Sequence, residues 1–198
     1  MDDVLADLER RGIRASRAAA EVGGGSISRT LRIESDGGPL LLKIESAERA
    51  DMLAAEHEAL EAIAAARAVA VPAVIAQGAA GRAAYLAIEW IDFAAKTDGA
   101  AHALGVALAR LHRSTAASFG WHRDNFIGTT PQRNDRSDDW ARFYRDMRLA
   151  PQLELARRNG LSAETLRLGT QLLGNVERLL RGHAPAPSLL HGDLWGGN

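Results

Sequence analysis

The stretch LLLKIESAERADMLAAEHEALEAI, residues 40–63, decides the fold, because it joins two different hydrophobic patterns. Residues 40–44 are a compact apolar run around one lysine, Lys43, which is typical of a strand. Residues 47–66 have the length and periodicity of a long helix. This segment therefore predicts a strand that carries a cation, followed directly by a helix.

The predicted helix carries a carboxylate on its apolar face. Four residues have the spacing i, i+3, i+7 and i+10, which places them on one helix face: Leu53, Glu56, Leu60 and Ile63. A carboxylate buried there without a cation would be costly, so we expect a partner from the sheet. Lys43 alternates with Leu42 and Ile44 and is the natural candidate. The alternative is that Glu56 lies at the edge of the stripe and Lys43 extends to solvent.

The rest of the first ninety residues predicts a mostly antiparallel sheet with this one helix inserted. Turns rich in glycine and proline separate short apolar runs at 23–26, 36–39 and 78–81. The expected elements are a leading helix at 2–11 and strands at 17–22, 27–34, 40–44, 69–75 and 85–91. Pro72 suits an edge strand or the start of a strand.

The turn at 23–26 has enough glycine for its backbone to approach a phosphate. The N–H groups of Gly24 and Gly25 can come close to an anion, and Ser26 and Ser28 add hydroxyls. The alternative is a plain hairpin turn, which is the commoner use of glycines between two strands. The sequence contains neither a GxxxxGK[ST] nor a GxGxxG motif.

After Asp92 the hydrophobic pattern becomes helical. Apolar spacing predicts helices at 98–113, 138–149 and 162–181, with Trp140, Phe143 and Met147 in the core. Residues 119–135 are too rich in aromatic and turn-forming residues for a plain linker. A short strand is expected at 188–190. We therefore divide the chain into one lobe at 1–92 and a mainly helical lobe at 93–198.

The block HGDLWGGN, residues 191–198, holds the strongest chemical signal. Asp193 and Asn198 lie five residues apart, just after an apolar pair. At this spacing the carboxylate can orient and deprotonate an attacking hydroxyl while the amide oxygen binds Mg²⁺, as phosphoryl transfer requires. The alternative is a polar surface turn, which Gly196 and Gly197 also suit.

Two other groups compete with this block. His122-Arg123-Asp124 imitates a kinase catalytic triplet, but residue 129 is threonine and no apolar strand precedes the triplet, so we assign it to loop structure or substrate contact. Arg145 and Arg148 share a helix face and could hold an anion, although a solvated stripe is the commoner explanation. The six histidines show no metal-binding spacing.

The composition predicts an ordinary globular protein with a small partner. Lys and Arg number 24 against 25 Asp and Glu, so the formal net charge of -1 gives no field that would gather nucleic acid or an anionic membrane. The absence of cysteine excludes disulfides, thiolate nucleophiles and zinc–thiolate sites. The acidic start and the lack of a long apolar run predict a cytoplasmic location.

In chain order, these features resemble the fructosamine kinases, also called ketosamine-3-kinases, within the superfamily of aminoglycoside phosphotransferases, choline kinases and protein kinases. The resemblance spans nearly the whole chain. It rests on VGGGSISRTLRI (22–33), LLLKI (40–44), LAIEWID (86–92), FGWHRDNFIGTTPQRN (119–134) and LLHGDLWGGN (189–198). The last two motifs are the most specific, and together they separate this family from the antibiotic kinases.

The resemblance implies an α+β, bilobal, protein-kinase-like fold. It also implies ATP- and Mg²⁺-dependent phosphorylation of a sugar 3-hydroxyl on small or protein-bound fructosamines or ribulosamines, which is a deglycation repair activity. By resemblance, Lys43 is a ligand of the α/β-phosphates and Glu56 is its partner. Asp193 is the catalytic base and Asn198 a Mg²⁺ ligand, both in a catalytic loop at 191–198.

The resemblance further implies where the rest of the nucleotide and the acceptor lie. The glycine turn would cover the phosphates with Gly24, Gly25, Ser26 and Ser28. The backbone of the hinge would meet adenine at Glu89, Trp90 and Ile91. The loop 119–135 would contact the ketosamine substrate.

The family pattern continues past residue 198, with a second metal-binding Asp and helices that close the lobe. We therefore expect the C-terminal lobe of this chain to be incomplete, and the chain alone to be inactive. One alternative is a non-catalytic nucleotide-binding remnant of such a kinase. Another is a phosphotransferase for a different small alcohol, such as an aminoglycoside or choline.

Overall fold

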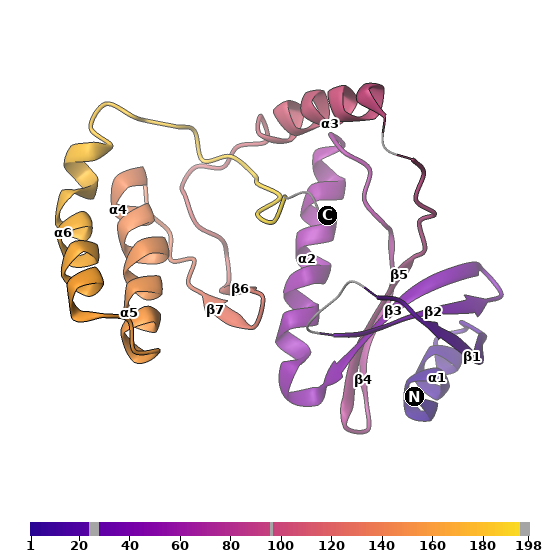
Figure 1. Ribbon diagram of the computed structural model, residues 1–198. Helices are drawn as coiled ribbons and strands as arrows, with labels where there is room; N and C mark the ends of the chain where they lie inside the picture. Colours follow the sequence, from indigo (N-terminus) through magenta and orange to yellow (C-terminus); the bar gives the residue numbers. More distant parts are fainter. Residues whose placement is uncertain (24–27, 96, 195–198) are drawn as a thin grey trace. The chain divides into compact units, whose positions relative to one another are not determined.

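The computed structural model describes residues 1–23, 28–95 and 97–194 and consists of two compact units (Figure 1). The first unit is Met1–Leu111 and the second is His112–Asn198. The lobe boundary predicted at 92/93 lies inside the first unit and stays a prediction. The two units are described separately below.

The first unit is built on an antiparallel sheet, as the turn spacing predicts. In its described residues the sheet has five strands in the order β1-β2-β3-β5-β4. The strands are β1 (Ala15–Glu21), β2 (Arg29–Ser35), β3 (Gly38–Ser46), β4 (Val74–Ala80) and β5 (Ala83–Glu89). Every pairing between neighbours is antiparallel, so short turns suffice to connect most of them.

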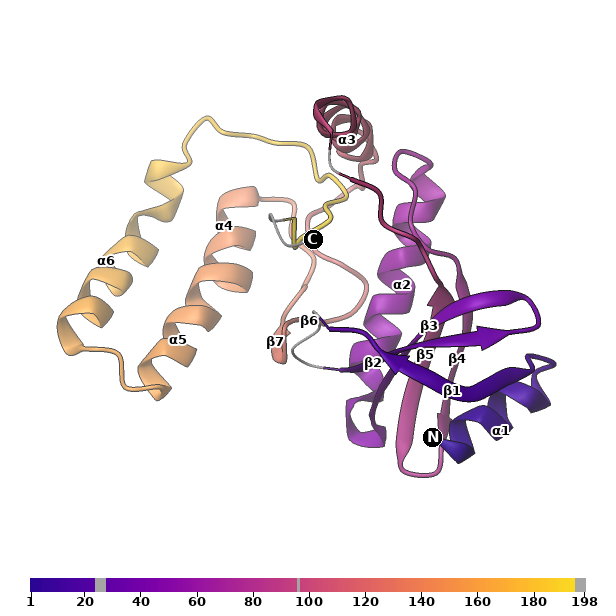
Figure 2. The same cartoon turned by 45° about the vertical axis from the view of Figure 1, so that its right-hand side comes forward.

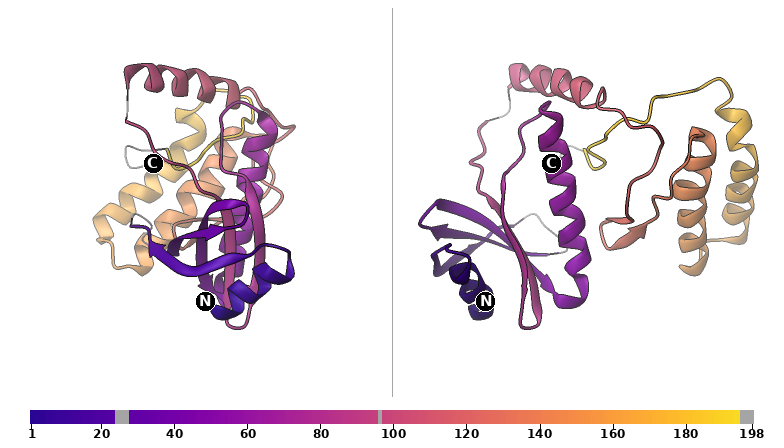
Figure 3. Two further views of the ribbon diagram at one scale, coloured as in Figure 1. Left: turned by 90° about the vertical axis from the view of Figure 1, so that its right-hand side faces the viewer. Right: turned by 180° about the vertical axis from the view of Figure 1, so that it is seen from behind.

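Two helices cover opposite faces of this sheet, as the view from behind shows (Figure 3). On one face, α1 (Asp2–Arg10) buries Val4 and Leu8 against alternate residues of the strands, including Leu42. On the other, α2 (Ala50–Ala66) buries Leu53 against Leu86. Because side chains alternate along a strand, β3 contributes to both hydrophobic clusters. The predicted leading helix and inserted helix are confirmed, with a single 3-10 turn at Ala47–Arg49 before α2.

The strand predicted at 69–75 is wrong, because β4 begins at Val74 and runs to Ala80. Pro72 has no N–H for the ladder, and Ala73 is held instead by Glu89, whose N–H donates to the Ala73 carbonyl at 2.8 Å. Gly78, predicted to lie in a turn, is inside the strand. The reversal of the chain is later, at Gly81, which has φ +61°. The helix predicted at 98–113 is confirmed as α3 (Asp98–Leu111).

The second unit contains a small hairpin and a pair of helical segments that lie side by side (Figure 2). The hairpin pairs β6 (Asn125–Ile127) with β7 (Thr130–Gln132) inside the loop 119–135. The helix α4 (Trp140–Tyr144) widens into a π-helical segment at Arg145–Leu149 and continues as α5 (Ala150–Arg158). The last helix is α6 (Ala163–Leu179), which confirms the prediction at 162–181.

Two predictions for this unit need correction. The helix predicted at 138–149 continues to Arg158, because Pro151 stands in the first turn of α5, where a missing N–H costs least. The strand predicted at 188–190 is reduced to a single antiparallel bridge between Ser188 and Thr115. The Leu189 N–H donates to the Ser114 carbonyl at 2.8 Å, so the segment is still anchored before residue 191.

Candidate functional site

An ion pair between β3 and α2 is the centre of the candidate site in the first unit. Lys43 Nζ donates a hydrogen bond to Glu56 Oε1. The Lys43 side chain keeps 25% of its exposure and that of Glu56 keeps 33%, so the pair is half-buried and still open to solvent. The predicted pairing is confirmed, whereas its role in binding a nucleotide stays a prediction.

The register of the sheet explains how Lys43 comes to face α2. Lys43 lies directly opposite Leu86 of β5, which is fully buried on the face that α2 covers. Its neighbours Leu42 and Ile44 point to the opposite face, toward α1. On the other side of β3, Thr30 of β2 is the cross-strand partner of Lys43. Lys43 is thus flanked by a hydroxyl on one strand and by an apolar side chain on the other.

The predicted phosphate-binding turn is only partly described. Ser28 is partly buried, and its carbonyl accepts a hydrogen bond from Thr30 Oγ1 at 3.3 Å. Thr30 therefore connects Ser28 to the strand position opposite Lys43. Gly24, Gly25 and Ser26 lie outside the described residues, so their predicted role is not tested.

The predicted hinge leaves one backbone donor available. The Glu89 N–H donates to the Ala73 carbonyl, and the Trp90 N–H to the Pro39 carbonyl at 3.3 Å. The Glu89 carboxylate accepts from the Ala73 N–H at 3.1 Å. Within the described residues the N–H of Ile91 has no hydrogen-bond partner. Of the three hinge amides, only that of Ile91 can therefore donate to a ligand without breaking an existing bond.

In the second unit, the predicted catalytic base lies in an exposed loop. The N–H of Asp193 donates to His191 Nδ1 at 3.3 Å, which makes a tight turn around Gly192 at φ +87°. The loop follows directly on the segment anchored to Ser114. Asn198, the predicted Mg²⁺ ligand, lies outside the described residues. In the ranges that the structure does describe, no group of three or more His, Asp or Glu side chains could hold a metal ion.

The loop 119–135 is organised by a buried asparagine that sequence reasoning missed. Asn134 Nδ2 donates to Asn125 Oδ1 at 2.9 Å and to the Arg123 carbonyl at 3.1 Å. Its N–H donates to Asp124 Oδ1 at 2.9 Å. Asp124 therefore has a part in loop structure, which is one of the two roles predicted for it. The only signal for Asn134 in the sequence is its place at the end of the FGWHRDNFIGTTPQRN motif.

The two arginines considered as an anion site are held by protein groups. Arg148 donates to Asn134 Oδ1 and to the Arg133 carbonyl, both at 2.7 Å, and lies 4.7 Å over the Phe143 ring. Burial lowers the pKa of this guanidinium. Arg145 pairs with Asp146 at 2.7 Å and Glu177 at 2.5 Å, and the hydrogen bond that it donates to Asp146 is the main cause of its raised pKa. Both side chains therefore stabilise the unit itself.

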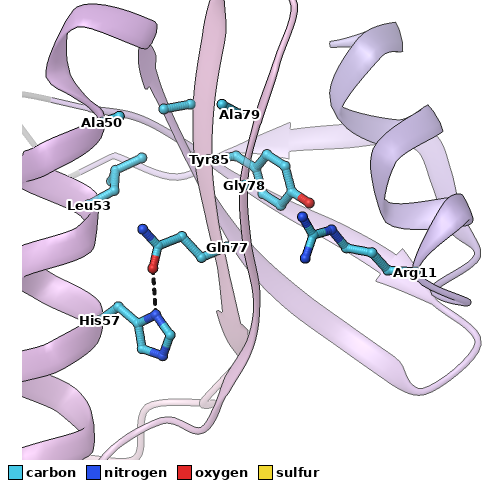
Figure 4. Close-up of a pocket in the computed structure, with 9 residues that line it drawn as sticks. Arg11, Ala50, Leu53, His57, Gln77, Gly78, Ala79 and Tyr85 are labelled. Atoms are coloured by element: carbon cyan, nitrogen blue, oxygen red, sulfur yellow. Dashed lines mark hydrogen bonds between the residues drawn. The ribbon is translucent and has the colours of Figure 1, made fainter.

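A hollow of about 490 Å³ in the first unit lies beside β4 and away from the predicted site residues (Figure 4). His57 of α2 enters it and bonds through Nδ1 to Gln77 Oε1 at 2.5 Å. Arg11 and Tyr85 also line it. None of the predicted catalytic or nucleotide-binding residues is among its lining residues.

Comparisons with known proteins give one consistent result. The sequence pattern described as fructosamine kinase matches residues 3–198. A probable ketoamine kinase of Synechocystis sp. is 37% identical over 178 residues, which are 89% of this chain and 59% of that protein. The chloroplastic protein-ribulosamine 3-kinase of Arabidopsis thaliana is 36% identical over 180 residues, 89% of this chain and 55% of the plant protein. The chain thus spans little more than half the length of these two relatives.

Solved structures agree with this assignment. A candidate fructosamine-3-kinase from Thermobifida fusca superposes with a TM-score of 0.83 at 30% identity, covering 100% of this chain and 69% of that one. Another from Haemophilus somnus shares the fold, with a TM-score of 0.86 at 24% identity over 98% of this chain and 66% of the other. The predicted α+β, protein-kinase-like fold is confirmed. With its family pattern matched from residue 3 to residue 198, the chain belongs to the fructosamine kinase family.

Proposed function

We propose that the protein containing this chain transfers a phosphoryl group from ATP to a sugar hydroxyl of a ketosamine, small or protein-bound. The observation that carries the proposal is the ion pair of Lys43 with Glu56 on the open part of the sheet face. A lysine held by a carboxylate keeps its charge in place for the phosphates of a nucleotide. Membership of the fructosamine kinase family supports the ketosamine as acceptor.

Each candidate residue has a distinct task in this reaction. Lys43 binds the α/β-phosphates, and Glu56 fixes the lysine side chain between β3 and α2. The free N–H of Ile91 donates to the base, next to Glu89 and Trp90 in the hinge. Ser28, together with Gly24, Gly25 and Ser26, covers the phosphates with backbone N–H groups and hydroxyls.

Asp193 orients the acceptor hydroxyl and takes its proton as the oxygen attacks the terminal phosphorus. The amide oxygen of Asn198 is a suitable ligand for Mg²⁺, which binds oxygen donors. With Mg²⁺ bound, the negative charge of the phosphates is partly neutralised during transfer. In the described residues of the chain, no helix is long and apolar enough to span a membrane. We place the activity in the cytoplasm, in keeping with the cysteine-free composition.

The test is ADP production by the complete protein with ATP and ribulose-lysine, choline or kanamycin as acceptor. We expect turnover with ribulose-lysine and little with the other two. Asp193→Asn is expected to lower turnover by about 10²–10⁴-fold while ATP affinity is largely kept. ATP binding without turnover on any acceptor would instead support a nucleotide-binding remnant.

A further inference from the structure

A second cation, Arg32, lies on the same sheet face as Lys43. Arg32 of β2 is the cross-strand partner of Leu41 in β3, and Leu41 packs with the hydrophobic cluster under α2. Two residues along each strand, Thr30 faces Lys43. Side chains two residues apart on a strand share a face, so Arg32 and Lys43 project from the same side of the sheet.

The Arg32 side chain is held over Trp90, the middle residue of the predicted hinge. Its guanidinium carbon lies 5.2 Å from the centroid of the Trp90 ring. Trp90 is itself anchored, because its N–H bonds to the Pro39 carbonyl and its Nε1 donates to Asp92 Oδ1 at 2.7 Å. Arg32 therefore reaches from β2 across β3 to the end of β5, at the edge of the sheet face where the hinge starts.

The guanidinium keeps hydrogen-bonding capacity in this position. Nη1 pairs with Glu34 Oε1 at 2.6 Å. An arginine has five N–H donors, and within the described part of the chain no partner occupies those on Nε and Nη2. A flat cation stacked on an indole loses little conformational freedom when it binds a ligand. The Arg32 side chain keeps 39% of its exposure, so it is an oriented donor that a ligand can reach from solvent.

We propose that Arg32, oriented by Trp90, binds the nucleoside end of ATP and so adds to nucleotide affinity. Arg32 lies in β2, a strand that carries none of the residues assigned above to base binding. The inference rests on the proposed function. A nucleotide with its phosphates at Lys43 and its base at the Ile91 amide lies along the sheet face beside Leu41. From residue 41 to residue 43 is roughly 7 Å at the rise of a strand, so Arg32 borders the part of the ligand away from the phosphates.

The experiment measures the dissociation constants of ATP and of adenosine for the complete protein by calorimetry. Arg32→Ala is expected to weaken both ligands by the same factor, about tenfold, since the lost contact is to the nucleoside. Lys43→Ala is expected to weaken ATP and leave adenosine unchanged. Arg29→Ala is the matched control, because Arg29 is in the same strand on the opposite face, paired with Glu21. It should change neither constant.

Two further variants separate binding from folding. Arg32→Lys keeps the charge and loses the planar fork, so it should recover only part of the affinity. Trp90→Leu releases the guanidinium and should weaken adenosine in the same direction as Arg32→Ala. Unchanged constants for both ligands in Arg32→Ala, with ATP still bound by the unsubstituted protein, would overturn this inference alone. Failure of the unsubstituted protein to bind ATP would overturn the proposed function as well.

Discussion

The contributions of the Lys43–Glu56 ion pair to stability and to ATP affinity can be measured separately. Lys43→Met removes the charge and keeps the aliphatic stem. Both side chains still reach solvent, so we expect the free energy of unfolding to fall by about 1 kcal/mol or less, while ATP affinity falls strongly. Urea unfolding and a nucleotide titration on the same samples test this. A loss of several kcal/mol with unchanged ATP affinity would make the pair purely structural.

Tyr85 ties the sheet to α1 through one hydrogen bond. The buried hydroxyl donates to Asp7 Oδ2 at 2.6 Å, and Arg10 and Arg11 contact the same carboxylate at 2.8 Å. These donors, Tyr85 first, hold the pKa of Asp7 well below its usual range. Burial, followed by the bond to Asp7, raises the pKa of Tyr85 to about 12.

These two shifts predict the pH dependence of stability. A carboxyl with a lowered pKa in the folded state stabilises above its unfolded pKa of about 3.9, and this contribution is lost as the pH falls further. A phenol with a raised pKa stabilises below its unfolded value of about 10, and this contribution is lost as the pH rises toward 12. Stability should therefore decrease at both ends of the pH range.

Tyr85→Phe should flatten that profile. The variant lacks the phenol and its bond to Asp7, so we expect a loss of about 1.5 kcal/mol near pH 7 and a smaller further loss at pH 3 and pH 11 than in the unsubstituted protein. Urea denaturation at the three pH values measures it. Parallel profiles for the two proteins would show that other groups control the pH dependence.

The contrast between Glu56 and Asn134 shows which site residues the sequence can reveal. Glu56 is found because helical spacing puts it on an apolar stripe and the strand pattern offers Lys43, and both are local regularities. Asn134 has its partners at Arg123, Asn125 and Arg148, on segments with no common period. Its importance arises only from tertiary packing.

At the scale of elements, Gly78 controls how closely α1 approaches the sheet. A Cβ at this position would lie 2.9 Å from Asp7 Oδ2 and 2.9 Å from Tyr85 Cε1. Gly78→Ala should therefore displace one of these side chains and cost about 1–3 kcal/mol. Gly105→Ala in α3 is the control, since no atom lies within 4 Å of its Cβ and a helix favours alanine. Thermal unfolding that ranks the two variants in the opposite order would contradict this account.

The same glycine explains why β4 is the least well predicted strand of the five-stranded sheet. A glycine after an apolar run indicates a turn, so the pattern favours a strand that ends at Ile75. The strand continues instead to Ala80, because the Tyr85 side chain fills the space that a Cβ at 78 would take. In the second unit the helix continues past Pro151, which stands in the first turn of α5 directly after the π-helical segment. Regular hydrophobic periodicity predicts β3, α2 and α6 well. It does not reveal places where tertiary packing makes an element depart from that pattern.

At the scale of the whole chain, the two units differ in the size of their cores. The first unit buries two clusters of apolar residues on the two faces of the sheet. Among the described residues of the second, only Phe143, Val176 and Asn134 are buried, while three leucines of α6 keep about half their exposure: Leu168, Leu172 and Leu179. We expect the first unit to be the more stable.

Hydrogen exchange followed by mass spectrometry can test this difference on the 198-residue chain. Amides of β3 and β5 should be the slowest to exchange, because opening them exposes both clusters. Amides of α6 should exchange much faster, because opening this helix exposes little additional apolar surface. Equal protection of β5 and α6 would indicate that the chain unfolds as one cooperative body.

The bond between Tyr85 and Asp7 also has a consequence for how the protein is made. It joins residues 78 positions apart, and the strand that carries Tyr85 leaves the ribosome long after α1. At about 5–20 residues per second, roughly 4–16 s pass between the synthesis of the two residues. During that interval Val4 and Leu8 can pack only against the strands already made, such as β3 with Leu42, and not against β4 and β5. The helix at the start of the chain is therefore translated early and completes its docking late, once β5 has emerged and paired with β3.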